Sequence, residues 1–172
     1  MTRDFDDNEF PLAYLISFRC YGTWLHCDKR GSVNRKQNRF GTPRLPPNPK
    51  LVKAERKLLK HRPIKLNAQR RSVVENAIRE VCRFRAYLLL AFNIRSNHVH
   101  SVVSAAVKPE PILQAFQAYA TRALRKKGLL PPDVKPWSRH GSTPYLWKER
   151  DVDRAIEYVL YGQGDELPRF DD

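Results

Sequence analysis

The sequence predicts an α+β fold of the ferredoxin-like type, in which a βαββαβ chain forms one antiparallel sheet with its helices on one face. Two observations predict it. Runs of β-favouring residues alternate with helical apolar stripes in that order, and one more amphipathic stripe near the C-terminus adds a last helix. The length of 172 residues and an apolar content of 41% suit a single domain, residues 1–172, with a substantial core.

The first half of this order rests on three patterns. Residues 12–24 are rich in aromatic and β-favouring side chains, which predicts the first strand. Over residues 67–83 apolar pairs recur every four residues, which predicts a helix, and Asn67 suits its N-cap. Residues 85–94 have the composition of a buried strand, and after a tight turn residues 98–106 form the third strand.

The second half begins with a helix that opens at Pro109 and ends in the basic run 125–127, as a helix C-terminus should. A short fourth strand is expected at residues 144–147. Asp151 is a candidate N-cap for the last helix, which runs to about Tyr161 and ends before two glycines.

Residues 29–71 carry the whole charge surplus. The chain has 32 Lys and Arg against 18 Asp and Glu, and this segment holds fifteen basic residues and one acid, 15 − 1 = +14. Most of it falls in a basic, proline-containing excursion at about residues 28–66, too long for an ordinary turn. Such a block is typical of a protein that binds a polyanion, and a solvated loop without a specific partner is the alternative. The candidate DNA-binding residues are Arg35, Lys36, Arg39, Arg44, Lys53, Arg56, Lys57, Lys60, Arg62, Lys65, Arg70 and Arg71.

Several classes of protein are disfavoured. No run of 18 or more apolar residues predicts a transmembrane helix, and the acidic N-terminus lacks the apolar stretch of a signal peptide. Three cysteines, Cys20, Cys27 and Cys82, cannot all pair and form no CxxC motif, which favours a reducing cytoplasm without a disulfide framework or zinc ribbon.

The sharpest local motif is the pair His98 and His100. Two histidines separated by one residue on a strand point to the same face, so both imidazoles can reach one metal ion. The alternative is a pair of surface histidines without a metal.

The last helix carries two tyrosines outside its apolar stripe. Val152, Ala155, Ile156, Val159 and Leu160 form that stripe; at 100° per residue Tyr158 lies roughly 130° and Tyr161 roughly 170° from its centre. A tyrosine placed there presents its hydroxyl to a cleft or to solvent, and an ordinary surface tyrosine is the alternative.

Four segments in order resemble the single-tyrosine transposases of the His-hydrophobe-His (HUH) superfamily, in particular the branch associated with repetitive extragenic palindromes (REP). These segments, from residue 21 to residue 164, are Tyr-Gly-Thr-Trp-Leu (21–25), Asn-His-Val-His-Ser-Val-Val (97–103), Ser-Arg-His-Gly-Ser-Thr (138–143) followed by Leu-Trp (146–147), and Ala-Ile-Glu-Tyr-Val-Leu (155–160) followed by Gly-Gln-Gly (162–164).

This resemblance implies a role for each matched residue. Tyr158 is the nucleophile, which forms a 5′-phosphotyrosine link, and His98, His100 and Gln163 hold Mg²⁺ or Mn²⁺. Gln163 lies five residues after Tyr158, whereas the better-known members have this Gln four residues on, so the third ligand stays open and Tyr161 remains an alternative nucleophile. The implied partner is single-stranded or hairpin DNA, cleaved and rejoined by a cytoplasmic, nucleoid-associated bacterial protein. A monomer is favoured, and a homodimer is the alternative.

Two other functions remain open from the sequence. One is a non-catalytic nucleic-acid-binding protein on the same scaffold, although the aromatic motif of ferredoxin-like RNA-binding modules is missing. The other is a metallo-phosphodiesterase that uses a metal-bound water and forms no covalent adduct.

Overall fold

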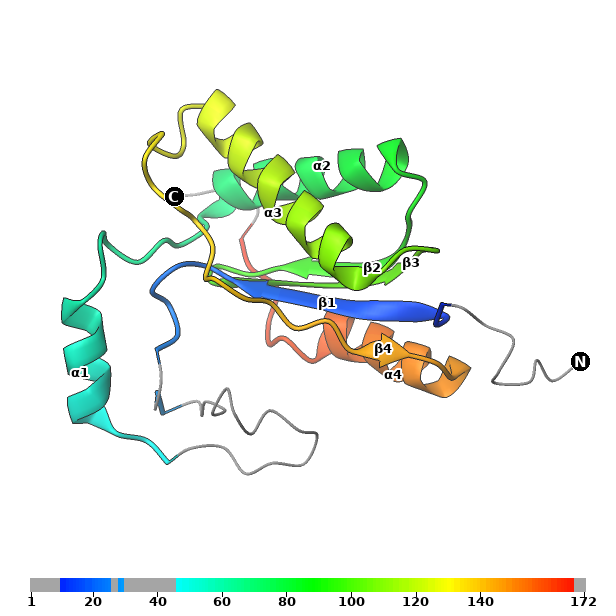
Figure 1. Ribbon diagram of the computed structural model, residues 1–172, viewed down its shortest axis with the longest axis horizontal. Helices are drawn as coiled ribbons and strands as arrows, with labels where there is room; N and C mark the ends of the chain where they lie inside the picture. The colour runs from blue at the N-terminus through cyan, green and yellow to red at the C-terminus, as the bar shows by residue number, and fades with distance from the viewer. Residues whose placement is uncertain (1–9, 26–27, 30–45, 169–172) are drawn as a thin grey trace, which may run out of the picture.

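One four-stranded antiparallel sheet, in the order β2-β3-β1-β4, organises the part of the chain that the structure describes (Figure 1). The structure is a computed structural model that describes residues 10–25, 28–29 and 46–168. The strand order confirms the predicted α+β fold of ferredoxin-like type. In chain order the elements are β1 (Ala13–Arg19), α1 (Pro49–Lys57), α2 (Ala68–Phe84), β2 (Leu88–Ile94), β3 (His98–Ser104), α3 (Pro109–Lys126), β4 (Tyr145–Leu146) and α4 (Glu149–Tyr161).

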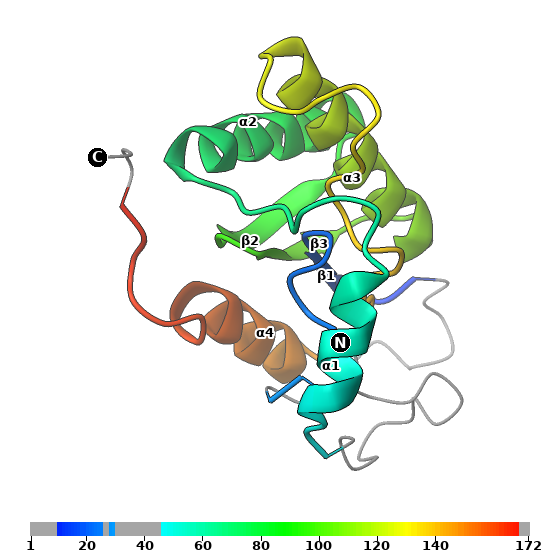
Figure 2. The same cartoon turned by 90° about the vertical axis from the view of Figure 1, so that its left-hand side faces the viewer.

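Helices cover both faces of the sheet. α2 and α3 lie on one face and α4 on the other, as Figures 1 and 2 show. The larger core lies under α2 and α3, where Tyr14, Phe18 and Phe116 are fully buried. The smaller core, under α4, consists of Ala13, Ala91, Val102, Leu146, Ala155 and Val159. The C-terminal helix is therefore fixed to the opposite face from the other two, as an addition to the βαββαβ unit.

The register of β1 against β3 decides which side chains meet near α4. Ser17 is paired with His100, and Arg19 with His98. β1 ends at Arg19, earlier than the predicted residue 24, because the chain turns there. Gly22 has a φ of +71°, and the hydroxyl of Thr23 donates to the Cys20 carbonyl at 2.8 Å.

The segment before β4 lies against β1 and leaves no room for a side chain at Gly141. The Ser17 amide donates to the Ser142 carbonyl at 2.9 Å, and the Ser142 amide donates back at 2.8 Å. A Cβ at Gly141 would lie 2.6 Å from the Ser17 carbonyl oxygen, so this close approach of two backbones requires glycine.

The helix ends follow the predicted signals with one exception. Asn67 caps α2 as expected, because its side-chain oxygen accepts from the Arg70 amide at 3.0 Å. The prediction that Asp151 caps the last helix is wrong: α4 begins at Glu149, and its N-cap is Lys148, which makes no side-chain cap bond. Asp151 lies in the first turn instead, where its negative charge favours the helix dipole.

α1 is part of the basic excursion and stands apart from the two layers (Figure 2). Asn48 caps it, and none of its residues is buried. The segment after α1 is tied to the end of β1, since the Tyr21 hydroxyl accepts from the Lys60 amide at 2.8 Å and its ring lies 4.0 Å from the His61 ring. No helix of the described part is long and apolar enough to span a bilayer.

Candidate active site

Two histidines of β3 project from the α4 face of the sheet. His98 and His100 are separated by one residue, and the alternation of side chains along a strand puts both on this face. Their ring centroids are 4.7 Å apart and both side chains are half-buried. The structure thus brings the two imidazoles together as the sequence spacing predicts.

Both ring nitrogens of His98 face side-chain amide oxygens. Nδ1 lies 2.6 Å from Asn97 Oδ1, and Nε2 lies 3.1 Å from Gln163 Oε1. The Gln163 amide is oriented by its nitrogen, which donates to the Tyr158 carbonyl at 3.0 Å. A neutral imidazole has one N–H and one acceptor nitrogen, so the tautomer of His98 decides which of the two oxygens accepts a hydrogen bond from the ring.

An imidazole nitrogen and an amide oxygen are both potential metal-ligand atoms, and their separation here can be compared with that of adjacent ligands. Adjacent ligands about 2.1 Å from an octahedral ion are about 3.0 Å apart, close to the 3.1 Å between His98 Nε2 and Gln163 Oε1. Among the described residues no group of three or more His, Cys, Asp or Glu side chains could hold a metal. The ligands expected from the sequence are the two imidazoles and the amide oxygen of Gln163, and the structure brings His98 together with both His100 and Gln163.

His100 is neutral at physiological pH. Its Nδ1 lies 2.5 Å from the hydroxyl of Ser17 on the neighbouring strand, which orients the ring. Burial, the neighbouring His98 and the positive charge of Arg19 lower the pKa of His100 to about 4. The neutral imidazole is the form that binds metals.

The packing of one face of α4 fixes the rotation of this helix about its own axis. Ala155 and Val159 are buried in the smaller core, and the side-chain amide of Asn93 on β2 donates to the Val159 carbonyl at 3.0 Å. Leu160, which the sequence pattern assigns to the apolar stripe, is 43% exposed. The packed face is therefore narrower than predicted.

Tyr158 is the tyrosine of α4 that the structure places against the histidines. Its ring centroid is 5.4 Å from that of His100, with the ring planes at 66°, and the residue is 46% exposed. Tyr161 is 78% exposed. The side chain next to the pair of imidazoles is thus the one that the sequence favours as the nucleophile.

The end of α4 explains the unusual spacing of Gln163. The helix ends at Tyr161 with Gly162 as its C-cap, and the chain then turns so that Gln163 folds back onto the Tyr158 carbonyl. A Cβ at Gly162 would lie 2.7 Å from the Tyr158 carbonyl oxygen and 3.0 Å from Cδ2 of its ring. The turn thus brings a residue five positions after Tyr158 back beside it.

Two arginines bind backbone carbonyls of the chain that follows Gln163. Arg95, in the turn between β2 and β3, donates to the Asp165 carbonyl at 2.7 Å. Arg71 of α2 donates to the Pro168 carbonyl. Ser17 and Arg95 are not predicted as site residues by any sequence pattern, because their roles depend on contacts between segments far apart in the chain. Asn97 belongs to the motif at residues 97–103, but no role for it follows from the sequence alone.

The candidate DNA-binding residues fall into three groups. Arg35, Lys36, Arg39 and Arg44 lie outside the described residues. The second group is exposed on α1 and on the segment between α1 and α2, and consists of Lys53, Arg56, Lys57, Lys60, Arg62 and Lys65. Arg70 and Arg71 are half-buried, and their guanidinium groups donate to the carbonyls of Lys65 and Leu66 respectively, so they also contribute to the local structure.

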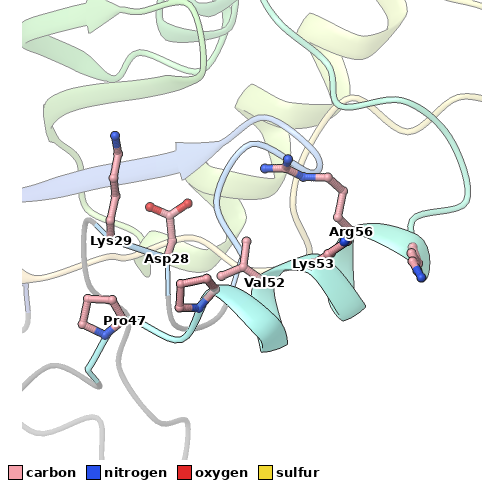
Figure 3. A pocket seen from close by; sticks show the side chains of 8 residues that line it. Asp28, Lys29, Pro47, Val52, Lys53 and Arg56 are labelled. Atoms are coloured by element: carbon pink, nitrogen blue, oxygen red, sulfur yellow. The ribbon is translucent and has the colours of Figure 1, made fainter.

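A pocket of about 690 Å³ lies along one side of α1 (Figure 3). Basic and apolar side chains line it together, among them Lys53, Arg56 and Val52 of the helix and Lys29 from the chain after β1. This places part of the basic block around a concave surface.

Comparison with known proteins gives weak structural similarity and no sequence match. No family model matches the sequence, and no curated protein matches it. The structure is similar to that of a REP-associated tyrosine transposase bound to a REP hairpin, with a TM-score of 0.48 and 12% sequence identity. The similarity covers 86% of this chain and 63% of that chain, so this protein spans less than two thirds of the transposase chain.

Proposed function

We propose that this protein cleaves and rejoins single-stranded DNA at palindromic or hairpin sequences, with Tyr158 as the nucleophile and a divalent metal in the site. One observation carries the proposal. Tyr158 lies on α4 and Gln163 just after it, and they meet His98 and His100 of a distant strand. His98 and Gln163 are 65 positions apart in the chain. A nucleophile beside a set of metal ligands is what metal-assisted transfer of a phosphodiester needs.

The metal ligands in this proposal are His98, His100 and Gln163. Imidazole nitrogens alone favour softer ions, whereas an amide oxygen and phosphate oxygens of the substrate suit Mg²⁺ or Mn²⁺. When bound, the ion would neutralise charge on the scissile phosphate and orient it. Ser17 and Asn97 would keep the two rings in place through Nδ1, so that Nε2 of each remains available as a ligand atom.

Tyr158 supplies the covalent step. Its phenolic oxygen loses its proton and attacks the phosphorus while the bond to the 3′ oxygen breaks. The 3′ oxygen takes up one proton, so the products are a 5′-phosphotyrosine and a free 3′-OH with no net change in protons. The ester keeps the energy of the phosphodiester, so a 3′-OH can later reseal the strand without ATP. The partial exposure of Tyr158 leaves its ring accessible to a DNA strand.

A denaturing-gel assay tests the proposal. Labelled single-stranded DNA that carries a palindromic hairpin with its flanking sequence is incubated with protein and Mn²⁺. We expect a protein–DNA adduct that is lost in Tyr158→Phe and in EDTA, and that persists in the matched control Tyr161→Phe. Tight binding without an adduct would instead identify a non-catalytic binding protein, and cleavage without an adduct would identify a hydrolase.

A binding measurement tests the metal ligands separately from catalysis. Gln163→Ala removes the amide oxygen that faces His98, so we expect the Mn²⁺ affinity, measured by electron paramagnetic resonance of free Mn²⁺, to fall about tenfold or more. Gln114→Ala, on the exposed side of α3, is the control and should leave the affinity unchanged. Equal affinities of the two variants would exclude Gln163 as a ligand.

A further inference from the structure

Arg19 lies beside the histidine pair, although neither the metal site nor the covalent step assigns it a role. It is the last residue of β1, is paired with His98, and comes two residues after Ser17, which contacts His100. Side chains two apart on a strand share a face, so Arg19 points to the same face as the two histidines. Its positive charge reaches the site, because it contributes to the lowered pKa of His100.

Trp24 fixes the position of the Arg19 side chain. The guanidinium carbon lies 3.6 Å from the centroid of the Trp24 ring system, a cation–π contact. The turn that carries Trp24 is tied down on both sides, since the Thr23 hydroxyl donates to the Cys20 carbonyl at 2.8 Å and lies 3.4 Å from the Asn97 carbonyl. The cation is thus held by the same turn that adjoins His98.

A guanidinium held over an aromatic ring is well suited to bind a phosphate. Its planar fork of N–H donors matches two oxygens of one phosphate. Holding the side chain in place beforehand lowers the entropic cost of binding. Arg19 is itself exposed, so a ligand from solvent can reach it.

The position of Arg19 and Trp24 connects the histidine pair to the basic region. Tyr21, two residues after Arg19, contacts His61 and accepts from the Lys60 amide at the foot of α1. Arg19 and Trp24 therefore lie on the same turn as the attachment point of the basic excursion.

We propose that Arg19, seated on Trp24, is a binding site for one backbone phosphate of the DNA, either the scissile phosphate or its immediate neighbour. The inference rests on the proposed function, because it takes the DNA strand to lie at the histidine pair. The guanidinium donates two N–H bonds to the two non-bridging oxygens of that phosphate, which holds the strand in register with Tyr158.

A phosphate-by-phosphate scan tests this site. Each phosphate of the hairpin-bearing strand is replaced in turn by a neutral methylphosphonate, and binding is measured by fluorescence anisotropy in EDTA. The variants are Arg19→Gln and Arg19→Lys. The matched control is Arg79→Gln, since Arg79 also lies over an aromatic ring, that of Phe92 at 4.4 Å, but belongs to α2 on the other face of the sheet.

We expect one position, at or next to the phosphate that forms the adduct, where methylphosphonate weakens binding of the wild type and of Arg79→Gln at least tenfold. Arg19→Gln should be insensitive at that position, and Arg19→Lys should keep part of the effect. If Arg19→Gln keeps the wild-type profile, no phosphate sits on Arg19 and the inference is overturned, whatever the adduct assay shows. If no adduct ever forms but a single position still depends on Arg19, the phosphate site stands and the proposed catalysis fails.

Discussion

His100 is the residue on which the ionisation of the candidate site depends most. It is largely enclosed between β1, α4 and the neighbouring His98, and Ser17 fills the hydrogen-bonding capacity of its Nδ1. Burial is the largest reason that its pKa falls to about 4, from an ordinary value of 6.5. The site therefore presents a neutral imidazole over the whole physiological range, which favours metal binding.

This lowered pKa makes the stability of the metal-free protein depend on pH. Between about pH 6.5 and about pH 4 the unfolded chain binds a proton at His100 that the folded chain does not, so the free energy of unfolding falls as the pH falls through this window. We expect thermal denaturation in EDTA to show this loss, and His100→Asn, which cannot titrate, to show less of it. An identical pH profile for the two proteins would contradict the burial of a neutral His100.

At the scale of elements, the C-terminal end of α4 organises the site. The helix has to end at Tyr161 for the chain to turn and bring Gln163 back over the last turn, and Gly162 leaves room for the Tyr158 ring. This turn accounts physically for a glutamine five residues after the tyrosine. The spacing alone leaves the third ligand open, because a one-residue shift on a continuous helix would rotate the side chain by about 100°.

Gly162→Ala should therefore disturb the site without unfolding the protein. The added Cβ would lie 2.7 Å from the Tyr158 carbonyl oxygen, so the turn has to shift and carry Gln163 with it. We expect the Mn²⁺ affinity and the rate of adduct formation each to fall about tenfold. The control is Gly128→Ala, where nothing lies within 4 Å but φ is +69°; it should cost about 1 kcal/mol of stability and leave Mn²⁺ affinity unchanged. If both variants bind Mn²⁺ like the wild type, the turn does not position Gln163.

At the scale of the whole molecule, the candidate site and the basic region meet at one end of the sheet. α1 carries exposed Lys53, Arg56 and Lys57, and contacts at Tyr21 tie the following segment to the end of β1. Phosphate contacts from such a region would supply much of the affinity for DNA, and that affinity would fall steeply with salt. In this account the basic region binds the DNA strand, and the candidate site reacts with it.

Neutralising α1 should change binding and its salt dependence together. The triple variant Lys53→Gln, Arg56→Gln, Lys57→Gln should bind single-stranded DNA more weakly, and the slope of log affinity against log salt should shrink by about 0.7 for each phosphate that the variant no longer neutralises. The control neutralises three exposed basic residues elsewhere, Arg83, Lys126 and Lys127. An equal reduction in both triple variants would show that only net charge matters, and not the position of α1.

Local patterns predict the elements well and the contacts between them poorly. Asn67 caps its helix and the two histidines share a face because both features depend only on neighbouring residues. The contact of Ser17 with His100 depends on a strand register across 83 residues, which no local pattern contains. Asp151 was wrongly predicted as a cap because Lys148, a poor capping residue, begins the helix without a side-chain bond.

The central claim is that Tyr158 forms the covalent bond to DNA, and mapping that bond tests it most directly. The adduct formed in Mn²⁺ is treated with nuclease and protease, and the peptide that carries the remaining nucleotide is identified by mass spectrometry. We expect the phosphate on Tyr158, linked to the 5′ end of the cleaved strand. A phosphate on Tyr161 would contradict the placement of Tyr158 beside the histidines, and a link to the 3′ end would contradict the proposed reaction.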